Sequence, residues 1–391
     1  MKQFRLSIFL TFSFILLFNI SISSYAYSGV LASENFKTIN RIDATPVKNQ
    51  GKSFTCWSYT VISMIESELL TSGKGEYNLS EMFVVRQEYI EKAERFIRLH
   101  GTVGFGGGGG MNDPIDIIAK YGIVPVEAYS GMKNGDNFHI HDEMDIALKD
   151  YVTKITKNVK VPTLWKEGFI NLLDSFLGKV PEKFFYKNVE YTPLTFAKMI
   201  GFNPENYVLL SSFSHHPFYS RFIVEVPDNW SCARAYNLPL DEFEKIVDYS
   251  LEKGFSVAIA IDITERGFMW RDGIALALDN TNTQKQEDKS VILVEKDSTK
   301  YLFHETYVTQ QLRQDAFDSY ETTDDHGLQI VGKALDNNGN KFYIAKNSWG
   351  SESSAFQGYI YVSEQYFLFK ALTVLANKKG LPSEILLKQG F

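Results

Sequence analysis

The sequence predicts an α+β fold in which helices dominate the first part of the chain and strands dominate the last part. Two observations lead to this prediction. Before residue 254, apolar residues recur at the spacing of amphipathic helices. After it, apolar and polar residues alternate or form short apolar runs, as they do in strands. We therefore expect a helical part at about 46–254 and a mainly β-rich part at 255–391.

Composition agrees with a folded chain that has a large core. The 391 residues are 44% hydrophobic, 14% aromatic and 22% charged, which excludes a disordered or fibrous protein. The 40 Lys and Arg residues stand against 47 Asp and Glu residues, so the net charge is -7. An acidic chain without a long run of one charge argues against a basic groove, and we expect no nucleic-acid partner.

The first 26 residues predict an export signal. Lys2 and Arg5 precede an apolar run from Ile8 to Phe18, and Ser24-Tyr25-Ala26 is a small-x-small cleavage site. The run is shorter than the roughly 20 residues of a membrane span, so cleavage after Ala26 is favoured over a retained anchor. Cleavage removes two cations and no acids, which takes the net charge from -7 to -9. We expect an exported protein, periplasmic or secreted, with no other membrane contact.

Five segments carry the signals of helices. In the first, Trp57, Val61, Met64 and Ile65 form an apolar stripe, and polar residues such as Ser63 lie on the opposite side. A proline near the start and a glycine at the end delimit the third and fourth segments. The predicted helices are 53–70, 80–99, about 112–122, 192–201 and 241–253.

The last third carries the signals of strands. Residues 255–262 alternate, and two further apolar runs, 326–335 and 341–347, are joined by Asp-Asn-Asn-Gly-Asn. This pair predicts a β-hairpin. Pairing across the turn brings His326 and Asn347 to the same open end of the hairpin.

The chain has two cysteines, Cys56 and Cys232, so at most one disulfide can form. Cys56 lies in the first turn of the first predicted helix, and a helix N-terminus beside an imidazolium lowers the pKa of a thiol. Taken alone, Cys56 is better interpreted as buried packing. We interpret Cys232 as a packed or accessible free thiol, because a disulfide would extinguish a nucleophile at Cys56.

The surroundings of Cys56 favour catalysis. Gln50 precedes it by six residues, and its side-chain amide could share an oxyanion with the backbone N–H of Cys56. At the open end of the hairpin, the side-chain oxygen of Asn347 could accept from one ring N–H of His326 and leave the other nitrogen facing a thiol. Trp349 could shield that bond from water.

Three elements in this order, Gln-x5-Cys-Trp, Asp325-His326-Gly327 and Lys-Asn-Ser-Trp-Gly at 346–350, resemble the papain-type cysteine peptidases. The chain is most similar to their bleomycin hydrolase and aminopeptidase C branch. Cys56 and His326 are 270 residues apart, about twice the ~130 to 150 of papain-sized enzymes, which implies large helical insertions. The similarity extends to Leu79–Phe83, Gly109–Met111, Ala119–Pro125, Tyr191–Ile200, Arg313–His326 and Gly380–Glu384.

The resemblance implies a papain-like two-lobed fold, with the cysteine helix in one lobe and the histidine and asparagine in the other. It makes Cys56 the nucleophile, His326 the general base and acid, Asn347 the residue that orients His326, and Gln50 an oxyanion donor. Gly109 and Gly110 would line the substrate cleft, since a missing Cβ admits a peptide backbone. It implies peptide or protein substrates, a homo-oligomer that is hexameric in the branch, and neither a metal nor an organic cofactor.

Several features depart from the pattern of the branch. Phe54 and Thr55 replace small residues before the cysteine; we expect Phe54 to narrow the cleft and Thr55 to cap the helix. Met111 stands where the branch usually has glutamine. The C-terminal arm that reads the substrate's amino terminus in relatives looks shortened or absent. The overall similarity favours an aminopeptidase, and the short C-terminus favours an endopeptidase. An acyltransferase or an inactive peptide-binding protein is a weaker alternative.

Other polar groups are interpreted without a function. His139 and His141 could share a face as metal ligands do, but no third ligand follows at a recognisable spacing, and a solvated loop is favoured. The same holds for His215-His216. The acid pairs Asp324-Asp325 and Glu66 with Glu68 are interpreted as ordinary surface charge. The glycine run contains a GxGxxG pattern but follows no strand, so a dinucleotide site is rejected. About 20 residues separate Ala26 from Pro46, and we predict no inhibitory pro-segment.

Overall fold

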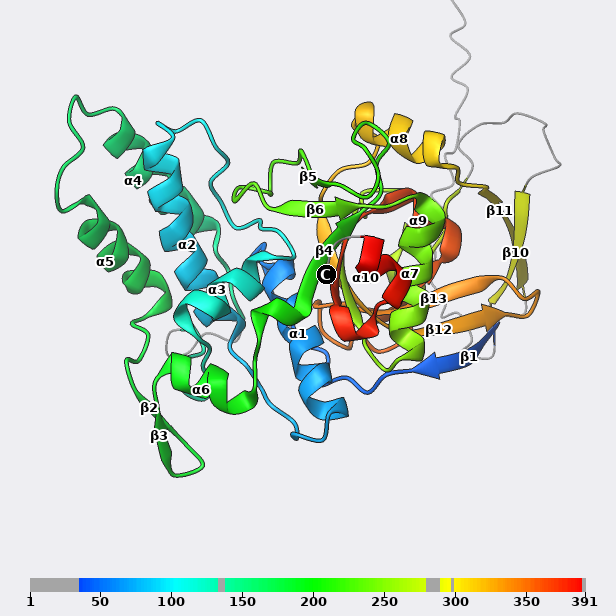
Figure 1. The fold of residues 1–391 in the computed structure, drawn as a ribbon, viewed down its shortest axis with the longest axis horizontal. Helices are drawn as coiled ribbons and strands as arrows, with labels where there is room; N and C mark the ends of the chain where they lie inside the picture. The colour runs from blue at the N-terminus through cyan, green and yellow to red at the C-terminus, as the bar shows by residue number, and fades with distance from the viewer. Residues whose placement is uncertain (1–34, 133–137, 279–288, 297–298, 389–391) are drawn as a thin grey trace, which may run out of the picture.

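The computed structural model describes residues 35–132, 138–278, 289–296 and 299–388. The chain forms two lobes that lie side by side, one of helices and one built on a large sheet (Figure 1). The expected α+β class is therefore confirmed. The predicted export signal at residues 1–26 lies outside the described residues. Within them, no helix is both long and apolar enough to cross a membrane.

Among the described residues, the first lobe consists of six helices and one short ribbon. The helices are α1 (Cys56–Thr71), α2 (Glu81–Arg98), α3 (Asp113–Tyr121), α4 (Asp142–Thr156), α5 (Trp165–Leu177) and α6 (Pro193–Ile200), and the ribbon pairs β2 (Phe184–Tyr186) with β3 (Val189–Tyr191). Four of the predicted helices correspond to α1, α2, α3 and α6, with ends within three residues of those predicted.

The second lobe contains an 11-stranded sheet in the order β5-β6-β4-β15-β7-β12-β13-β14-β9-β8, with β1 paired to β12 beside this path. Helices α7 to α10 belong to the same half of the chain, and α7 matches the fifth predicted helix. The strands are β1 (Phe36–Arg41), β4 (Tyr207–Ser211), β5 (Arg221–Ile223), β6 (Arg234–Asn237), β7 (Val257–Ile261), β8 (Phe268–Met269), β9 (Ile274–Ala275), β12 (His326–Asp336), β13 (Lys341–Lys346), β14 (Tyr359–Ser363) and β15 (Ala371–Asn377). The remaining elements are the ribbon of β10 (Lys289–Lys296) with β11 (Thr299–Thr306), the helices α7 (Leu240–Glu252), α8 (Gln310–Asp318), α9 (Glu364–Lys370) and α10 (Ser383–Lys388), and the 3₁₀ turns η2 (Pro204–Asn206), η3 (Trp270–Asp272) and η5 (Lys378–Gly380).

The hairpin predicted from the sequence is confirmed, and its register positions the site. Strands β12 and β13 are antiparallel, with Gln329 opposite Lys346. His326 begins β12 and pairs with Ile261 of β7, while Asn347 directly follows β13. Both residues therefore lie at the same end of the hairpin, as predicted.

Helix α1 lies between the lobes and is buried on both sides. Its apolar stripe, with Trp57 and Val61, belongs to the core of the helical lobe. The opposite side is also buried: Ser63 and Ser67 bond to the amide of Gln329 on β12 at 2.6 and 2.9 Å. A one-sided stripe therefore describes α1 incompletely, because its polar residues meet a second lobe instead of water.

The two lobes have separate apolar cores. The helical core draws almost entirely on residues between Trp57 and Ile200, and the sheet core takes in Val208, Leu210 and the apolar face of α7. Strands β4, β5 and β6 thus join the large sheet even though they precede residue 254. The change of core lies near residue 204, about 50 residues before the change of sequence pattern.

Candidate active site

Cys56 is the first residue of α1, so it lies in the first helical turn, as the sequence predicted. Thr55 holds the N-cap position but makes no side-chain capping bond; its hydroxyl bonds to the Ser53 hydroxyl at 2.5 Å instead. The expected capping role of Thr55 is therefore wrong. The backbone N–H groups of Trp57 and Gly327 both point at the Cys56 sulfur and favour the thiolate. Because Gly327 follows His326, this contact brings the sulfur beside the histidine.

His326 and Asn347 form the hydrogen bond that the sequence predicted. The ring Nε2 of His326 lies 2.7 Å from Oδ1 of Asn347, and the backbone N–H of Ser348 donates to the same oxygen at 2.7 Å. The ring of Trp349 covers the pair, with its centroid 4.6 Å from that of His326. With Nε2–H donating to Asn347, the neutral ring keeps Nδ1 free to accept a proton.

Gln50 is fixed beside His326 and Asn347 by hydrogen bonds to Ser348. Its backbone N–H donates to Ser348 O at 2.8 Å, and its Oε1 accepts from the Ser348 hydroxyl at 2.6 Å. Asn49 and Trp349 form a bridge between the same two segments. Because Oε1 is occupied, the orientation of the amide is set and its NH₂ group remains as a donor.

Burial determines the protonation of Cys56 and His326. It raises the pKa of the Cys56 thiol to about 12, and the carboxylates Asp324 and Asp228 add to this effect. Burial also lowers the pKa of His326 to about 4, although Asn347 and Asp325 oppose the change. At neutral pH both the thiol and the imidazole are therefore neutral. The sequence predicted a lowered thiol pKa, but the helix terminus does not overcome the desolvation of the sulfur.

The glycine run packs closely on the residues around Cys56. Trp57 Nε1 donates to Gly107 O at 2.8 Å. A Cβ on Gly109 would lie 2.9 Å from the Trp57 ring, and a Cβ on Gly110 would lie 2.7 Å from Asn112 Oδ1. Gly109 therefore needs glycine for internal packing because the Trp57 ring is buried, whereas at Gly110 the end of the Asn112 side chain can shift.

The unusual residues beside the site have specific surroundings. Phe54 is 57% exposed, its φ of 57° lies in the left-handed region, and its Cβ lies 3.0 Å from the position of a Cβ on Gly107. Met111 is buried and packs on Gly327, because its Cε lies 2.8 Å from where a Cβ of Gly327 would stand. Met111 thus supports the strand end that carries His326.

Two carboxylates for which the sequence predicts no function face the cysteine. Asp324, interpreted as ordinary surface charge, is half-buried and acts on the Cys56 thiol. Asp228, in the loop after β5, occupies the space where a Cβ of Gly108 would lie. Neither carboxylate makes a hydrogen bond or ion pair within the described residues. By contrast, Asp325 Oδ1 accepts from Thr323 Oγ1 at 2.8 Å.

Desolvation raises the pKa of Asp324 to about 8, and the charges of Asp228 and Asp325 add to this. No motif in the sequence marks this role. The only signal is the position of Asp324 two residues before His326, which places it at the same strand end.

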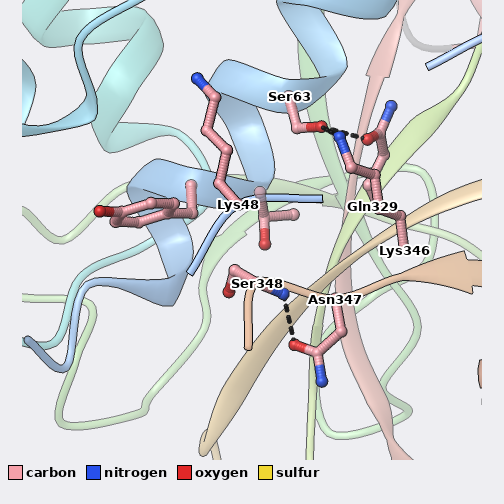
Figure 2. A pocket seen from close by; sticks show the side chains of 8 residues that line it. Lys48, Ser63, Gln329, Lys346, Asn347 and Ser348 are labelled. Carbon is pink, nitrogen blue, oxygen red and sulfur yellow. Dashed lines mark hydrogen bonds between the residues drawn. The ribbon is translucent and has the colours of Figure 1, made fainter. Parts of the chain in front are cut away.

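A buried polar network lies behind Asn347 (Figure 2). Lys346 Nζ donates to the Ser63 hydroxyl of α1 at 2.6 Å and to the Thr45 hydroxyl at 3.3 Å. Lys48 pairs with Glu66 and Glu81 at 2.9 and 2.6 Å. The interpretation of Glu66 as surface charge is wrong, since its side chain is fully buried. Glu68 is half-buried, and desolvation raises its pKa to about 7.

The structure also places the histidine pair His139 and His141 and the second cysteine, Cys232. His139 and His141 are both buried, so a solvated loop is wrong for them. Burial lowers the pKa of His141 to about 4, and among the described residues they do not belong to a group of three potential metal ligands. Cys232 is an exposed free thiol, as one of its two interpretations held.

Comparison with known proteins agrees with this arrangement. The Peptidase C1-like family matches residues 175–389, which is more than half of the chain and includes His326 and Asn347. The chain is 25% identical to an Aminopeptidase C of Lactobacillus delbrueckii subsp. lactis, over 88% of this chain and 82% of the relative. It is 22% identical to an Aminopeptidase W of the same organism, over 92% and 87% of the two chains.

A solved structure shows the same fold. The crystal structure of PepW from Lactobacillus rhamnosis superposes with a TM-score of 0.69 at 21% identity, over 90% of this chain and 84% of that one. The two-lobed fold, with a cysteine on the central helix and a histidine and asparagine on the sheet, is that of a papain-like cysteine peptidase. The chain belongs to the Peptidase C1-like family, which confirms the resemblance seen in the sequence.

Proposed function

We propose that the protein is a thiol-dependent aminopeptidase that removes residues from the free amino termini of peptides. In the first step His326 Nδ1 accepts the proton of the Cys56 thiol, and the sulfur forms a bond to the scissile carbonyl carbon. The carbonyl electron pair moves to oxygen, where the Gln50 amide and the backbone N–H of Cys56 stabilise it. The C–N bond then breaks, and His326 gives its proton to the leaving amine.

The second half of the reaction releases the acyl group. A water molecule gives a proton to His326 and its oxygen adds to the thioester carbon, which forms a second oxyanion in the same hole. When the C–S bond breaks, the sulfur takes the proton back from His326. Asn347 keeps the ring in the required tautomer throughout, because its Oδ1 binds Nε2–H at 2.7 Å.

The observation that carries the choice of aminopeptidase is the pair of carboxylates beside the nucleophile, which form no hydrogen bond or ion pair within the described residues, although the charge of Lys92 acts on Asp228. A free α-amino group has a pKa of about 8 and is largely protonated at neutral pH. Asp324 and Asp228 repel each other, and an ammonium group bound between them would relieve that repulsion. The names of the relatives, Aminopeptidase C and Aminopeptidase W, support the same choice.

This arrangement links recognition to reactivity. Burial first, and then the charges of Asp324 and Asp228, raise the pKa of the Cys56 thiol. A bound ammonium group would neutralise part of that negative field and so lower the pKa of the thiol when a correct substrate is present. Peptides without a free amine would lack this activation.

Paired peptides test the proposal directly. Matched substrates with free and acetylated amino termini are assayed under reducing conditions, with Cys56→Ala as the blank. Cleavage of the free-amine series alone supports an aminopeptidase. Equal cleavage of acetylated peptides would make the enzyme an endopeptidase. A preference for Lys or Arg before the cleaved bond would then show that the carboxylates bind a basic side chain of the substrate.

We also propose that the protein is exported and oligomeric. Export rests on the pattern at residues 1–26, and intact-mass measurement of protein from the producing cells is expected to give a chain that starts at Tyr27. A cytoplasmic chain that starts at Met1 would contradict export. The homo-oligomer rests on resemblance, with six chains as the expected number, and light scattering that gives the mass of one chain would contradict it.

A further inference from the structure

A second group of chemically active side chains lies outside the catalytic arrangement. His215 and His216 lie in the loop after β4, and Glu225 lies just after β5. His215 Nε2 is 3.2 Å from Glu225 Oε2, and His216 Nε2 is 2.9 Å from Glu225 Oε1. Among the described residues, this is the only group of three His, Cys, Asp or Glu side chains whose ligand atoms all lie within 4.8 Å of one another.

Aromatic packing holds both imidazole rings in place. The ring centroid of His215 is 5.7 Å from that of Phe317, with an angle of 20° between the planes. That of His216 is 4.8 Å from Phe222, and the two histidine rings are 4.5 Å apart. The two histidines lie in a solvent-exposed loop, as predicted, but their rings are packed on aromatic neighbours. Their ligand atoms are set before anything binds, which reduces the entropy that a ligand must remove.

Gln314 supports the histidine on the side away from Glu225. Its Oε1 accepts from Ser214 N at 2.6 Å and its Nε2 donates to Asp318 Oδ1 at 2.8 Å, so the amide orientation is fixed. His215 Nδ1 lies 3.0 Å from Gln314 Nε2 and 3.3 Å from Gln314 Oε1. Gln314 can thus donate to Nδ1, or accept from Nδ1–H and leave Nε2 free for a cation.

One side of the group faces solution. The side chains of His215, His216 and Glu225 are 29%, 35% and 53% exposed. The group is therefore open to ions from solution while its back is packed.

We infer that His215, His216 and Glu225 form a binding site for a divalent transition-metal ion, with zinc as the representative. Two imidazole nitrogens and one carboxylate are the donors that zinc takes in proteins, at about 2.0 to 2.2 Å from the ion. The N–O separations of 2.9 and 3.2 Å are close to the edges of such a tetrahedron. Solvent would supply the remaining ligands, because the exposed side of the group is open.

The donor set excludes the hard cations as the preferred occupants. Magnesium and calcium favour oxygen ligands, and imidazole favours zinc, copper and nickel. On binding, each neutral ring must carry its proton on Nδ1, so that Nε2 is free for the ion; in His215 that Nδ1–H can donate to Gln314 Oε1. The proposal is independent of the aminopeptidase activity.

Calorimetric titration with ZnCl₂ tests the site. The full chain is used without a histidine tag and with Cys56→Ser and Cys232→Ser, which removes both competing thiols. We expect one equivalent of zinc to bind and MgCl₂ to give no heat of binding. His216→Phe keeps the ring packed on Phe222 but removes a ligand, and should weaken zinc binding at least tenfold; Glu225→Gln should do the same.

His100→Ala, at an exposed histidine, is the matched control and should bind zinc like the parent. Circular dichroism without metal checks that each variant is folded. A folded His216→Phe or Glu225→Gln chain that binds zinc as tightly as the parent would overturn the proposal, and so would a parent that binds none at millimolar zinc.

Discussion

The two walls beside Cys56 are built in opposite ways. On one wall, His326, Asn347 and Gln50 are buried, and each is held by hydrogen bonds of 2.6 to 2.8 Å. On the other, Asp324 and Asp228 are half-buried and bond to nothing within the described residues. Hydrogen-bonded groups position one another, and carboxylates without a bonded partner favour the binding of a cation. The residues of the first wall perform the chemistry, and we expect those of the second wall to bind the substrate.

Loss of the histidine should have the largest effect. His326→Ala removes the group that takes the thiol proton, and because the thiol pKa is raised to about 12, almost no thiolate forms unaided at neutral pH. We expect kcat/KM to fall by roughly 10³-fold or more. Steady-state assays with a free-amine peptide measure it. Activity within tenfold of the parent would show that His326 and the residues bonded to it do not perform the chemistry.

Loss of the orienting bond should have a smaller effect. Asn347→Ala leaves His326 without the acceptor at 2.7 Å, so both the tautomer and the ring orientation become less populated. We expect kcat to fall by about 10 to 10²-fold with KM nearly unchanged. Asn158→Ala, at the end of α4, is the matched control and should be unaffected. A rise in KM alone would assign Asn347 to substrate binding.

Asp324→Asn should act on recognition. The pKa of Asp324 is raised to about 8 by desolvation and by Asp228 and Asp325. Its charged form therefore increases as the pH rises toward 8, and KM for free-amine peptides should fall over that range. In Asp324→Asn this pH dependence should disappear and KM at pH 8 should rise about tenfold.

The same variant should also lower the pKa of the Cys56 thiol, because a charge that raises it is gone. The pH dependence of Cys56 alkylation by iodoacetamide, with Cys232→Ser in parent and variant alike, measures this shift. An unchanged KM together with an unchanged alkylation profile would show that Asp324 acts neither on substrate binding nor on the Cys56 thiol.

Lys346→Met should affect stability rather than chemistry. Burial lowers the pKa of Lys346 to about 8 from 10.5, so between these values the unfolded chain binds more protons than the folded one. Stability from this group therefore rises with pH from about 8 to 10.5, by up to about 3 kcal/mol. Urea unfolding at several pH values should show this slope in the parent and lose it in Lys346→Met. An equal slope in both chains would contradict the buried position of the lysine.

The sequence predicts the wall that contains His326 and Asn347 better than the wall that contains Asp324, for physical reasons. The residues around Cys56, His326 and Asn347 lie in short motifs, and the hairpin register follows from alternation and a turn. Asp324 lies in no motif, and its surroundings come from a loop almost 100 residues away. The same reason applies to Glu66 and His141, which are buried against residues outside their own segments such as Lys48 and Lys52, and to β4, whose partner β15 lies near the end of the chain.

Strand β1 has a consequence for how the enzyme is made. It pairs with β12 from Phe36 opposite Asp336 to Arg41 opposite Gly332, and Ile42 N continues the contact by donating to Val331 O at 2.7 Å. This is the strand that begins with His326. A zymogen cleaved beyond Arg41 would lose an edge of its own catalytic strand, so we expect the newly folded enzyme to be competent without such a cut, and control of its activity to lie elsewhere than in proteolytic maturation.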